Sequence, residues 1–388
     1  MFISIQYLMD QENDIKHIIR EIQYKYAPDG RVEVFQIDTH QKGDTSIVNG
    51  VTTSKDAYDE LIGILKENHP AIIDSVRILP DVQLGEKTEG IVYNSVGTIR
   101  YAPRYNSEMI TQTLLGTKVK ILEEKNGWQR IQTPDKYIGW INGSVKPLSK
   151  AEILRYNEQP KVIVISFYAT SYESPDETSN PVSDLVIGNI LALKSESEDF
   201  YEVVYPDGRI AFLMKSDALT YEDWFKNIDL SGESIISSAL QFKGIPYLWG
   251  GTSSKGLDCS GFTKIVYFMH GITLPRDASQ QVDKGLLIDS NGEFSKLKPG
   301  DLIYFGTKGT KGIIGYENSE SNELNDDRVV HVGIYLGDNH FIHASDYVHI
   351  NSLNPSDALY DKFNAERYLR SKRYIENGKP INVDTISK

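Results

Sequence analysis

The chain has 388 residues, 40% of them hydrophobic, with 54 acidic against 41 basic side chains and a net charge of −13. This length predicts two to four domains with ample apolar core. The acidic balance leaves no basic patch for nucleic acid and little attraction to an anionic membrane, and no apolar run approaches the roughly 20 residues of a transmembrane helix. Residues 1–9 are too short for a signal peptide and lack its charged n-region and its cleavage site. We therefore expect a cytoplasmic protein if Met1 is the native start, or a periplasmic or cell-envelope protein if a signal was removed.

Residues 1–87 have the pattern of a small α+β domain. Residues 11–26 carry isoleucines on one helical face, and Ser54 is placed to cap a second helix that runs to residue 66. Alternating apolar residues predict three strands, at 31–37, 46–52 and 75–79. This order suggests an open-faced sandwich of unknown role, and we expect it to serve in packing or dimer contact rather than in chemistry.

The next part of the chain repeats itself. Residues 116–141 align without gaps on residues 188–213, an offset of 72, and Trp128 falls on Phe200. Short alternating runs separated by Pro-Asp turns predict two small β-barrels, at 88–148 and 161–220. The second copy is the more diverged, which suggests a structural spacer.

The only cysteine, Cys259, stands at a predicted helix start. Asp258 is a suitable N-cap, apolar residues recur at i, i+3, i+4 and i+7 from Phe262, and Gly271 ends the pattern. At the first helical position, unpaired backbone N–H groups and the helix dipole stabilise a thiolate. The alternative is a buried structural cysteine that behaves as a small hydrophobe.

Two histidines follow on a predicted hairpin. Residues 329–336 and 340–345 have the pattern of paired strands joined at 337–339. A three-residue loop makes His331 and His343 diagonal neighbours on one face. A register slip of one residue would separate them, so the inference depends on the loop length.

A cysteine at a helix start that faces a strand histidine, itself oriented by a third polar group, is the arrangement of a thiol hydrolase. Cys259 would be the nucleophile, His331 the general base and then acid, and His343 the orienting residue. Either histidine could instead be an ordinary, partly buried strand residue. A zinc site of His331, His340, His343 and Asp338 is disfavoured, because His340 and His343 cannot share a strand face and there is no second cysteine. We expect no metal or cofactor.

Six motifs in residues 231–375 occur in the order seen in NlpC/P60 cysteine peptidases, which this region resembles. They lie at 246–251, 258–262, 274–276, 299–302, 331–335 and 343–344. The resemblance implies a papain-like α+β core and cleavage of γ-D-glutamyl bonds in bacterial cell-wall peptides. It gives Cys259, His331 and His343 the same three roles. It also implies that the Tyr247 hydroxyl helps to form the oxyanion hole beside the Cys259 backbone N–H, although Tyr247 and Trp249 could be ordinary core aromatics.

The two repeats resemble bacterial SH3 (SH3b) domains. Two SH3b domains ahead of an NlpC/P60 domain resemble γ-D-glutamyl-L-diamino acid endopeptidases, which process murein tri- and tetrapeptides with a free L-Ala terminus. In that group the first SH3b domain binds the peptide's amino group. Glu108 and Tyr137 are the candidates here, since an ammonium needs a carboxylate and an aromatic or hydroxyl partner. Both could equally be solvated surface residues.

The same resemblance implies further substrate contacts in the catalytic domain. Asp258, Ser260 and Ser279 match substrate-contacting positions, and Trp249 is a further candidate. Asp258 could serve only as an N-cap, or fill both roles. Residues 306–328 form a longer Gly-rich, polar connection than the family usually has, and we expect a surface loop near the cleft without site residues.

Three functions compete at this point. The first is a recycling endopeptidase of released murein peptides. The second is a wall-remodelling D,L-endopeptidase acting on intact peptidoglycan, with the SH3b pair as wall anchors. The third is a non-catalytic SH3b wall-binding protein, disfavoured by the intact set of candidate catalytic residues. The diamino acid (meso-diaminopimelate or Lys), the compartment and the oligomeric state stay open.

Overall fold

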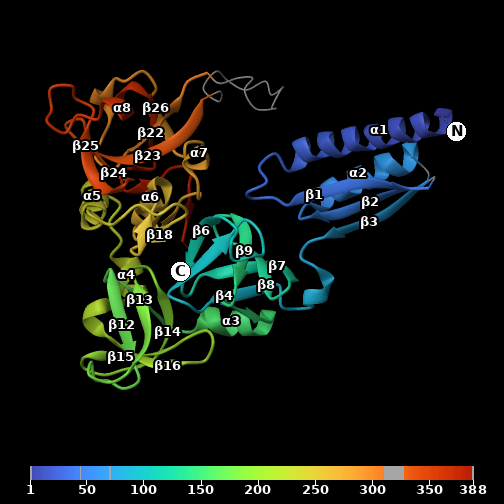
Figure 1. The fold of residues 1–388 in the computed structure, drawn as a ribbon. Helices are drawn as coiled ribbons and strands as arrows, with labels where there is room; N and C mark the ends of the chain where they lie inside the picture. The colour runs from blue at the N-terminus through green and yellow to red at the C-terminus, as the bar shows by residue number, and fades with distance from the viewer. Residues whose placement is uncertain (1, 44, 70, 310–326, 387–388) are drawn as a thin grey trace. The chain divides into compact units, whose positions relative to one another are not determined.

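The computed structural model describes residues 2–43, 45–69, 71–309 and 327–386, and it divides into two compact units (Figure 1). Unit 1 comprises Met1–Gly90, Tyr101–Ser107 and Lys118–Leu154. Unit 2 comprises Ile91–Arg100, Glu108–Thr117 and Arg155–Lys388. Residues 310–326, most of the long connection expected near the cleft, lie outside the described residues.

The N-terminal part of unit 1 is a three-stranded sheet packed against two helices (Figure 1). The helices are α1 (Phe2–Tyr26) and α2 (Lys55–Asn68), and the strands are β1 (Phe35–Lys42), β2 (Thr45–Thr52) and β3 (Ile72–Ile78). β1 pairs antiparallel with β2, whereas β2 pairs parallel with β3 across the α2 connection. Ser54 caps α2 as expected, but the strand predicted from residue 31 is wrong in its first half, because residues 31–34 form a turn.

The two repeats have matching strands. The first contains β4 (Glu89–Val92), β5 (Val96–Arg100), β6 (Met109–Leu114), β7 (Lys118–Lys125), β8 (Trp128–Gln132), β9 (Ile138–Asn142) and β10 (Val145–Leu148). The second contains β11 (Lys161–Val164), β12 (Tyr168–Tyr172), β13 (Pro181–Val186), β14 (Ile190–Glu196), β15 (Phe200–Val204), β16 (Ile210–Met214) and β17 (Ala218–Thr220). Every bound agrees with the 72-residue offset to within one residue, which confirms the internal repeat.

Finer details repeat as well. The β5–β6 ladder shifts register after Ile99 and the β12–β13 ladder after Ser171, which is again 72 positions later. Gly116 and Gly188 both have a φ of 85°, a left-handed conformation that suits glycine. The first repeat is divided between the units: hairpin β5–β6 belongs to unit 2, whereas β7, β8 and β9 belong to unit 1. The second repeat forms one sheet in the order β13-β12-β16-β15-β14-β11-β17.

In unit 1 the N-terminal sheet and the first repeat share a small core and a polar cluster. The apolar side chains come from both parts: Val34, Val51, Leu79, Leu122 and Ile138. Beside them, Arg130 donates to Glu123 at 2.9 Å and to the Gln36 side chain at 2.9 Å. The packing role expected for the N-terminal domain agrees with these contacts.

The C-terminal part of unit 2 is built on a six-stranded sheet in the order β21-β26-β22-β23-β24-β25. These strands are β21 (Leu286–Asp289), β22 (Leu302–Thr307), β23 (Arg328–Gly337), β24 (His340–Ser345), β25 (Tyr347–Ser352) and β26 (Tyr368–Arg373). The short strands are β18 (Thr252–Ser253), β19 (Gly256–Leu257), β20 (Ile272–Thr273), β27 (Ile375–Glu376), β28 (Lys379–Pro380) and β29 (Asp384–Thr385). Its apolar core lies between this sheet and the helices, chiefly α6.

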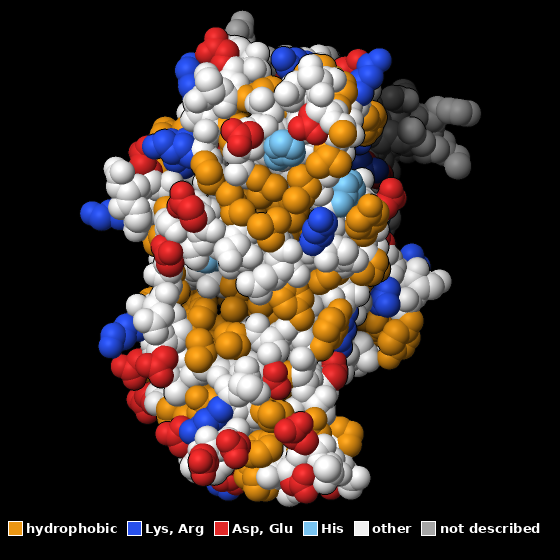
Figure 2. Space-filling view, turned by 90° about the vertical axis from the view of Figure 1, so that its left-hand side faces the viewer, with side chains coloured by type: hydrophobic (Ala, Val, Ile, Leu, Met, Phe, Trp, Pro, Cys, Tyr) orange, Lys and Arg blue, Asp and Glu red, His pale blue; other side chains and the backbone are white. Residues whose placement is uncertain are grey.

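The remaining helices of unit 2 are α4 (Tyr221–Lys226), α5 (Gly232–Gln241), α6 (Cys259–Phe268), α7 (Ala278–Gln281) and α8 (Lys362–Glu366); α3 (Lys150–Glu158) follows the first repeat. None of the helices within the described ranges is long and apolar enough to span a bilayer. On the face shown in Figure 2, Lys and Arg side chains lie singly among Asp and Glu side chains.

Candidate active site

Cys259 is the first residue of α6, as the sequence predicts. The Asp258 side chain caps the helix by accepting the Gly261 backbone N–H at 2.7 Å. The start of the helix packs closely against the preceding segment. A side chain at Gly261 would not fit, since its Cβ would be 2.0 Å from the Gly251 carbonyl oxygen. Cys259 is only 8% exposed. The nucleophile candidate is therefore held at a capped and closely packed helix end.

The expectation that the helix end stabilises a resting thiolate is wrong. Burial, together with the negative charge of Asp258, raises the pKa of the Cys259 thiol to about 12. Backbone N–H groups of Val332 and Ser260 and the charge of Arg276 act in the opposite direction without reversing the shift. Desolvation of a charged group outweighs a few N–H dipoles in a closed site. At neutral pH the substrate-free site holds a thiol.

A chain of hydrogen bonds starts at His331 and ends at a backbone carbonyl. His331 Nε2 lies 2.7 Å from His343 Nδ1, and His343 Nε2 lies 2.9 Å from Asn351 Oδ1. Asn351 Nδ2 donates to the Leu359 carbonyl at 3.3 Å, which orients Oδ1 toward His343. Since an amide oxygen only accepts, His343 carries its proton on Nε2 and accepts from His331 Nε2–H. The lone pair of neutral His331 is then on Nδ1.

The hairpin brings the two histidines together by a different turn from the one predicted. Instead of a three-residue loop, residues 338–339 form a two-residue turn with φ of 50° and 62°, and Gly337 pairs with His340. A bulge just before Gly337 offsets this change, so that Ile334 still faces Ile342. The diagonal register of the strands is thereby kept. The predicted proximity of the two histidines is confirmed, although the predicted loop is not.

Both histidines are buried and neutral. His331 is 8% exposed, and its ring lies 5.8 Å from the ring of Phe305 on the neighbouring strand. Burial, followed by the influence of His343, lowers the pKa of His331 well below 6.5. Burial lowers the pKa of His343 to about 4. At neutral pH the pair is therefore free to accept one proton.

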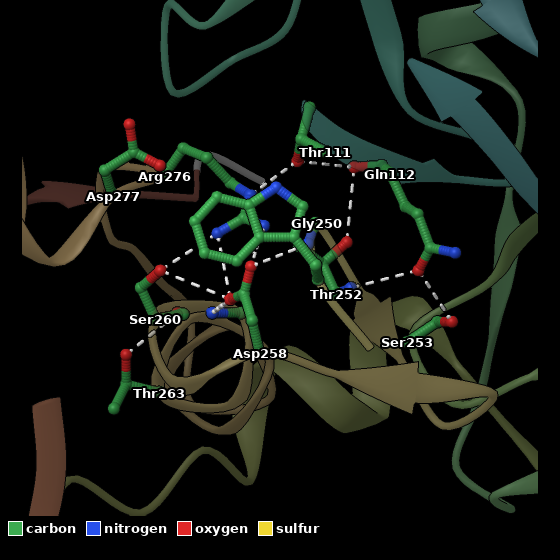
Figure 3. Close-up of polar contacts among 12 residues, drawn as sticks. Thr111, Gln112, Gly250, Thr252, Ser253, Asp258, Ser260, Thr263, Arg276 and Asp277 are labelled. Carbon is green, nitrogen blue, oxygen red and sulfur yellow. Dashed lines mark hydrogen bonds and ion pairs between the residues drawn. The ribbon is translucent and has the colours of Figure 1, made fainter. Parts of the chain in front are cut away.

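A second network fixes the helix start, and Figure 3 shows it. Arg276, only 1% exposed, donates to both carboxylate oxygens of Asp258, at 2.5 and 3.1 Å, and to Ser260 Oγ at 2.9 Å. The Gly250 backbone N–H donates to the same carboxylate at 3.0 Å. Arg276 Nε donates to Thr111 Oγ1 at 2.7 Å. Asp258 and Ser260 are thus occupied within the protein, and Thr111 of β6 joins the first repeat to them.

Gln112 makes the adjoining connection. Its side-chain oxygen accepts the Thr252 backbone N–H and the Ser253 hydroxyl, both at 3.0 Å, and its carbonyl accepts from Thr252 Oγ1 at 3.2 Å (Figure 3). Strand β6 therefore supports β18, which leads into α6. The sequence prediction missed Thr111, Gln112 and Asn351, for which it held no signal. Arg276 was visible only as part of the motif at 274–276.

Trp249 and Glu108 lie together. Trp249 is 63% exposed, and its indole Nε1 donates to Glu108 Oε1 at 2.8 Å. Glu108, the residue directly before β6, is exposed. The structure thus places the predicted ammonium-binding residue next to a predicted substrate-binding aromatic. Its role stays a prediction.

The other predicted residues are placed as follows. Tyr247 is half-buried, and burial together with Cys259 and Asp258 raises its pKa, so the hydroxyl keeps its proton. Ser279 lies in α7 and is partly exposed. Tyr137 belongs to unit 1, where it is 7% exposed. Across the described ranges, no three His, Cys, Asp or Glu side chains are grouped as metal ligands would be.

Comparison with known proteins identifies the family. Residues 244–373 match the NlpC/P60 family model. The chain is 32% identical over 274 residues to a γ-D-glutamyl-L-lysine dipeptidyl-peptidase of Bacillus cereus, an alignment that covers 68% of this chain and 76% of the relative. The chain belongs to the NlpC/P60 family. It is a cysteine peptidase.

Further similarities support this NlpC/P60 peptidase assignment. Residues 99–144 match the model of a bacterial dipeptidyl-peptidase SH3 domain, which confirms an SH3b domain in the first repeat. A γ-D-glutamyl-L-lysine dipeptidyl-peptidase of Bacillus subtilis is 27% identical, over 76% of this chain and 90% of the relative. The crystal structure of an NlpC/P60 family protein from Bacillus cereus superposes with a TM-score of 0.61 at 26% identity, covering 74% of this chain and all of that one.

The hydroxyl of Thr111 should matter to both stability and activity. Thr111→Val keeps the side-chain shape but leaves the buried Arg276 Nε–H without its acceptor, a cost of about 1–3 kcal/mol. We expect a lower melting temperature and a reduced kcat, because the start of α6 is held less firmly. Thr113→Val, at another buried position of β6, is the matched control. Equal effects of the two substitutions would show that the Arg276 contact is unimportant.

Alkylation should report the protonation state of Cys259. With the thiol pKa raised to about 12, iodoacetamide should modify the substrate-free protein at pH 7 far more slowly than free cysteine, whose pKa is ~8.5. The rate should still be rising at about pH 9.5. Mass spectrometry of the modified peptide measures it. A rate that reaches its plateau below pH 7 would instead indicate a resting thiolate paired with a protonated histidine.

Proposed function

We propose that this enzyme hydrolyses the γ-D-Glu–diamino acid bond of murein tri- and tetrapeptides that have a free N-terminal L-Ala, as a peptide-recycling endopeptidase. The observation that carries the proposal is the hydrogen-bonded chain from Asn351 through His343 to His331, next to Cys259. The relatives named as γ-D-glutamyl-L-lysine dipeptidyl-peptidases support the bond type. They also make Lys a candidate for the diamino acid.

Both reactive groups start uncharged in this mechanism. As Cys259 Sγ attacks the γ-carbonyl carbon, its proton passes to His331 Nδ1, and the new imidazolium keeps its Nε2–H bond to His343. The oxyanion accepts hydrogen bonds from the Cys259 backbone N–H and the Tyr247 hydroxyl. His331 then protonates the amine of the diamino acid as the C–N bond breaks and a thioester forms. Water, deprotonated by His331, hydrolyses the thioester and restores the thiol.

The pKa values fit this sequence of steps. A thiol with a raised pKa needs a neutral base, and the lowered pKa of His331 keeps its imidazole neutral at pH 6.5 and above. His343 stays a neutral acceptor over the same range, since its pKa is lowered to about 4. Proton transfer during the attack therefore replaces a preformed ion pair.

Glu108 supports a free-amine preference. The Trp249 indole holds one of its carboxylate oxygens at 2.8 Å and leaves the other for a ligand. A substrate ammonium bound there would gain a charge-assisted hydrogen bond, whereas a stem still attached through L-Ala has no ammonium. Glu108, Trp249, Asp258, Ser260, Ser279 and Tyr137 are the proposed substrate-binding residues.

We assign the second repeat as a second SH3b barrel, which makes the proposed domains 1–87, 88–148, 161–220 and 231–375. The shared offset of all seven strands supports this assignment. A role as a spacer is supported by its contacts with the segment that joins β18 to β19. Ser254 Oγ donates to the Phe167 carbonyl at 2.6 Å, the Tyr168 hydroxyl donates to the Ser254 carbonyl, and Lys255 pairs with Asp184.

The two histidines should differ in importance. With L-Ala-γ-D-Glu-L-Lys as substrate, Cys259→Ser should abolish turnover, and His331→Ala should reduce kcat by about 10⁴-fold or more. His343→Ala should cost less, because it removes only the group that orients His331. Product formation by mass spectrometry and the melting temperature of each variant make the comparison. Equal losses or the reverse order would mean that the two roles are exchanged.

The amino terminus of the substrate should control the rate. N-acetylation of L-Ala removes the ammonium, and the loss of one buried charge-assisted hydrogen bond predicts a fall in kcat/KM of about 10- to 150-fold. Glu108→Gln should reproduce much of that loss on the free peptide and narrow the difference between the two peptides. Glu124→Gln, at another exposed glutamate of the same repeat that also accepts a side-chain N–H, is the control.

The result that contradicts recycling is equally clear. Equal rates on free and acetylated peptides, together with efficient digestion of whole sacculi, would favour a wall-remodelling D,L-endopeptidase.

A further inference from the structure

Arg367 lies close to the catalytic histidines in the fold, although it is distant from both in the sequence. It follows α8 directly, and its carbonyl accepts the Gly306 backbone N–H at 2.9 Å. Gly306 follows Phe305, which pairs with His331 on one side and with Tyr368 on the other. The end of α8 is therefore anchored at the same end of the sheet as the catalytic base.

The guanidinium of Arg367 is held in one orientation. Its Nε and Nη2 both donate to Asn364 Oδ1, at 3.0 and 2.8 Å, and its central carbon lies 4.1 Å from the centre of the Phe363 ring. Asn364 is itself buried, and its backbone N–H donates to the side chain of Asp361, which caps α8, whereas Phe363 is 68% exposed. Nη1 has no hydrogen-bond acceptor among the residues the structure describes. The Arg367 guanidinium is thus preorganised, and its Nη1 can donate a hydrogen bond to a ligand.

Arg367 differs from the buried arginines of the same domain. Arg276, Arg370 and Arg373 form salt bridges with Asp258, Asp327 and Asp301 respectively. Arg367 forms no salt bridge within the described ranges. Partial burial lowers its pKa, and only the charge of Asp361, and that of Cys259 when it is ionised, act against that shift. A partly desolvated guanidinium without a carboxylate partner is suited to receive one from a ligand.

The charge of Arg367 acts on the histidine side of the site. It contributes, after burial and other causes, to the lowered pKa of both His331 and His343. Tyr247, by contrast, responds to Cys259, Asp258 and Arg276, which lie at the helix start. Cys259 therefore interacts with Tyr247 and Asp258 at the start of α6, which we call the oxyanion side, and with Arg367, which belongs to the histidine side.

The chemistry decides which part of the substrate meets Arg367. His331 must reach the amine that leaves, so the diamino acid lies on the histidine side. In a tripeptide this residue ends in a free α-carboxylate, one carbon from the scissile nitrogen. We propose that Arg367 binds the α-carboxylate of the leaving diamino acid, so that tripeptides, which end there, are cleaved faster than tetrapeptides. This inference rests on the proposed γ-D-glutamyl specificity.

The test compares L-Ala-γ-D-Glu-L-Lys with the same tripeptide as its C-terminal amide, using the full-length enzyme. The acid should be cleaved with a kcat/KM about 10- to 100-fold higher than the amide, mainly through KM. Arg367→Gln should remove that preference by slowing cleavage of the acid alone. Arg367→Lys, which keeps the charge but loses the planar fork, should retain part of it. Lys362→Gln, which removes an exposed positive charge from the same helix, should leave the preference intact.

Each other outcome has a definite meaning. Equal cleavage of acid and amide by the unmodified enzyme would overturn the inference and leave the γ-D-glutamyl proposal standing. A third peptide, amidated at the α-carboxylate of D-Glu, tests the other side of the scissile bond. If Arg367→Gln abolished a preference for the free D-Glu carboxylate instead, the inference would also be overturned, because Arg367 would then bind the acyl part of the substrate. Absence of cleavage of either peptide by the unmodified enzyme would contradict the proposed function itself. A melting temperature unchanged in Arg367→Lys shows that altered selectivity is not a folding defect.

Discussion

The buried ion pair between Asp258 and Arg276 is the contact on which the rest of the active site depends. Asp258 caps the helix that begins with Cys259, and Arg276 ties that cap to Ser260 and to Thr111 of the first repeat. A buried ion pair adds little net stability, but removal of one partner leaves an unpaired buried charge and costs about 3–5 kcal/mol. The value of this pair is positional. It couples the helix start to β6, so that the SH3b hairpin and the nucleophile share one rigid junction.

Burial determines the chemistry that this junction supports. Because Cys259 and His331 are buried, a charged thiolate and a charged imidazolium are both disfavoured, and the pKa shifts of the two residues reflect this. Catalysis by a neutral Cys259–His331 pair then depends on accurate proton transfer. This explains why His331 is hydrogen-bonded to His343, which is in turn hydrogen-bonded to Asn351. The bond from Asn351 to the Leu359 carbonyl fixes the orientation of the amide, and the next two bonds fix the tautomers of His343 and His331. Only His331 Nδ1 remains as a base.

Charges are distributed unevenly around the cleft. Glu108 lies beside Trp249, toward the hairpin of the first repeat, and Arg367 lies toward the histidines. A carboxylate and a guanidinium on different sides of the nucleophile suit a short peptide with an ammonium at one end and a carboxylate at the other. On the proposed function, such an arrangement would select substrates by length, since a longer chain cannot satisfy both ends at once. The second repeat contacts the segment between β18 and β19, which precedes α6, through Phe167, Tyr168 and Asp184.

The sequence by itself determined the parts of this protein that local pattern controls. Helical periodicity and a cap placed Cys259 at a helix start, and strand alternation placed the two histidines on one hairpin. The ungapped alignment of residues 116–141 on residues 188–213 predicted the internal repeat. The errors of the sequence prediction lie where tertiary surroundings decide. The hairpin loop was predicted to have three residues rather than two, because a bulge compensates for the shorter turn at 338–339. The thiol of Cys259 was predicted to be ionised, because a helix pattern does not reveal how deeply a residue is buried. Thr111, Gln112, Asn351 and Arg367 act through partners from about 8 to 165 residues away. Only the folded chain brings such residues together, because hydrogen bonding and desolvation depend on distance in space rather than on order in the sequence.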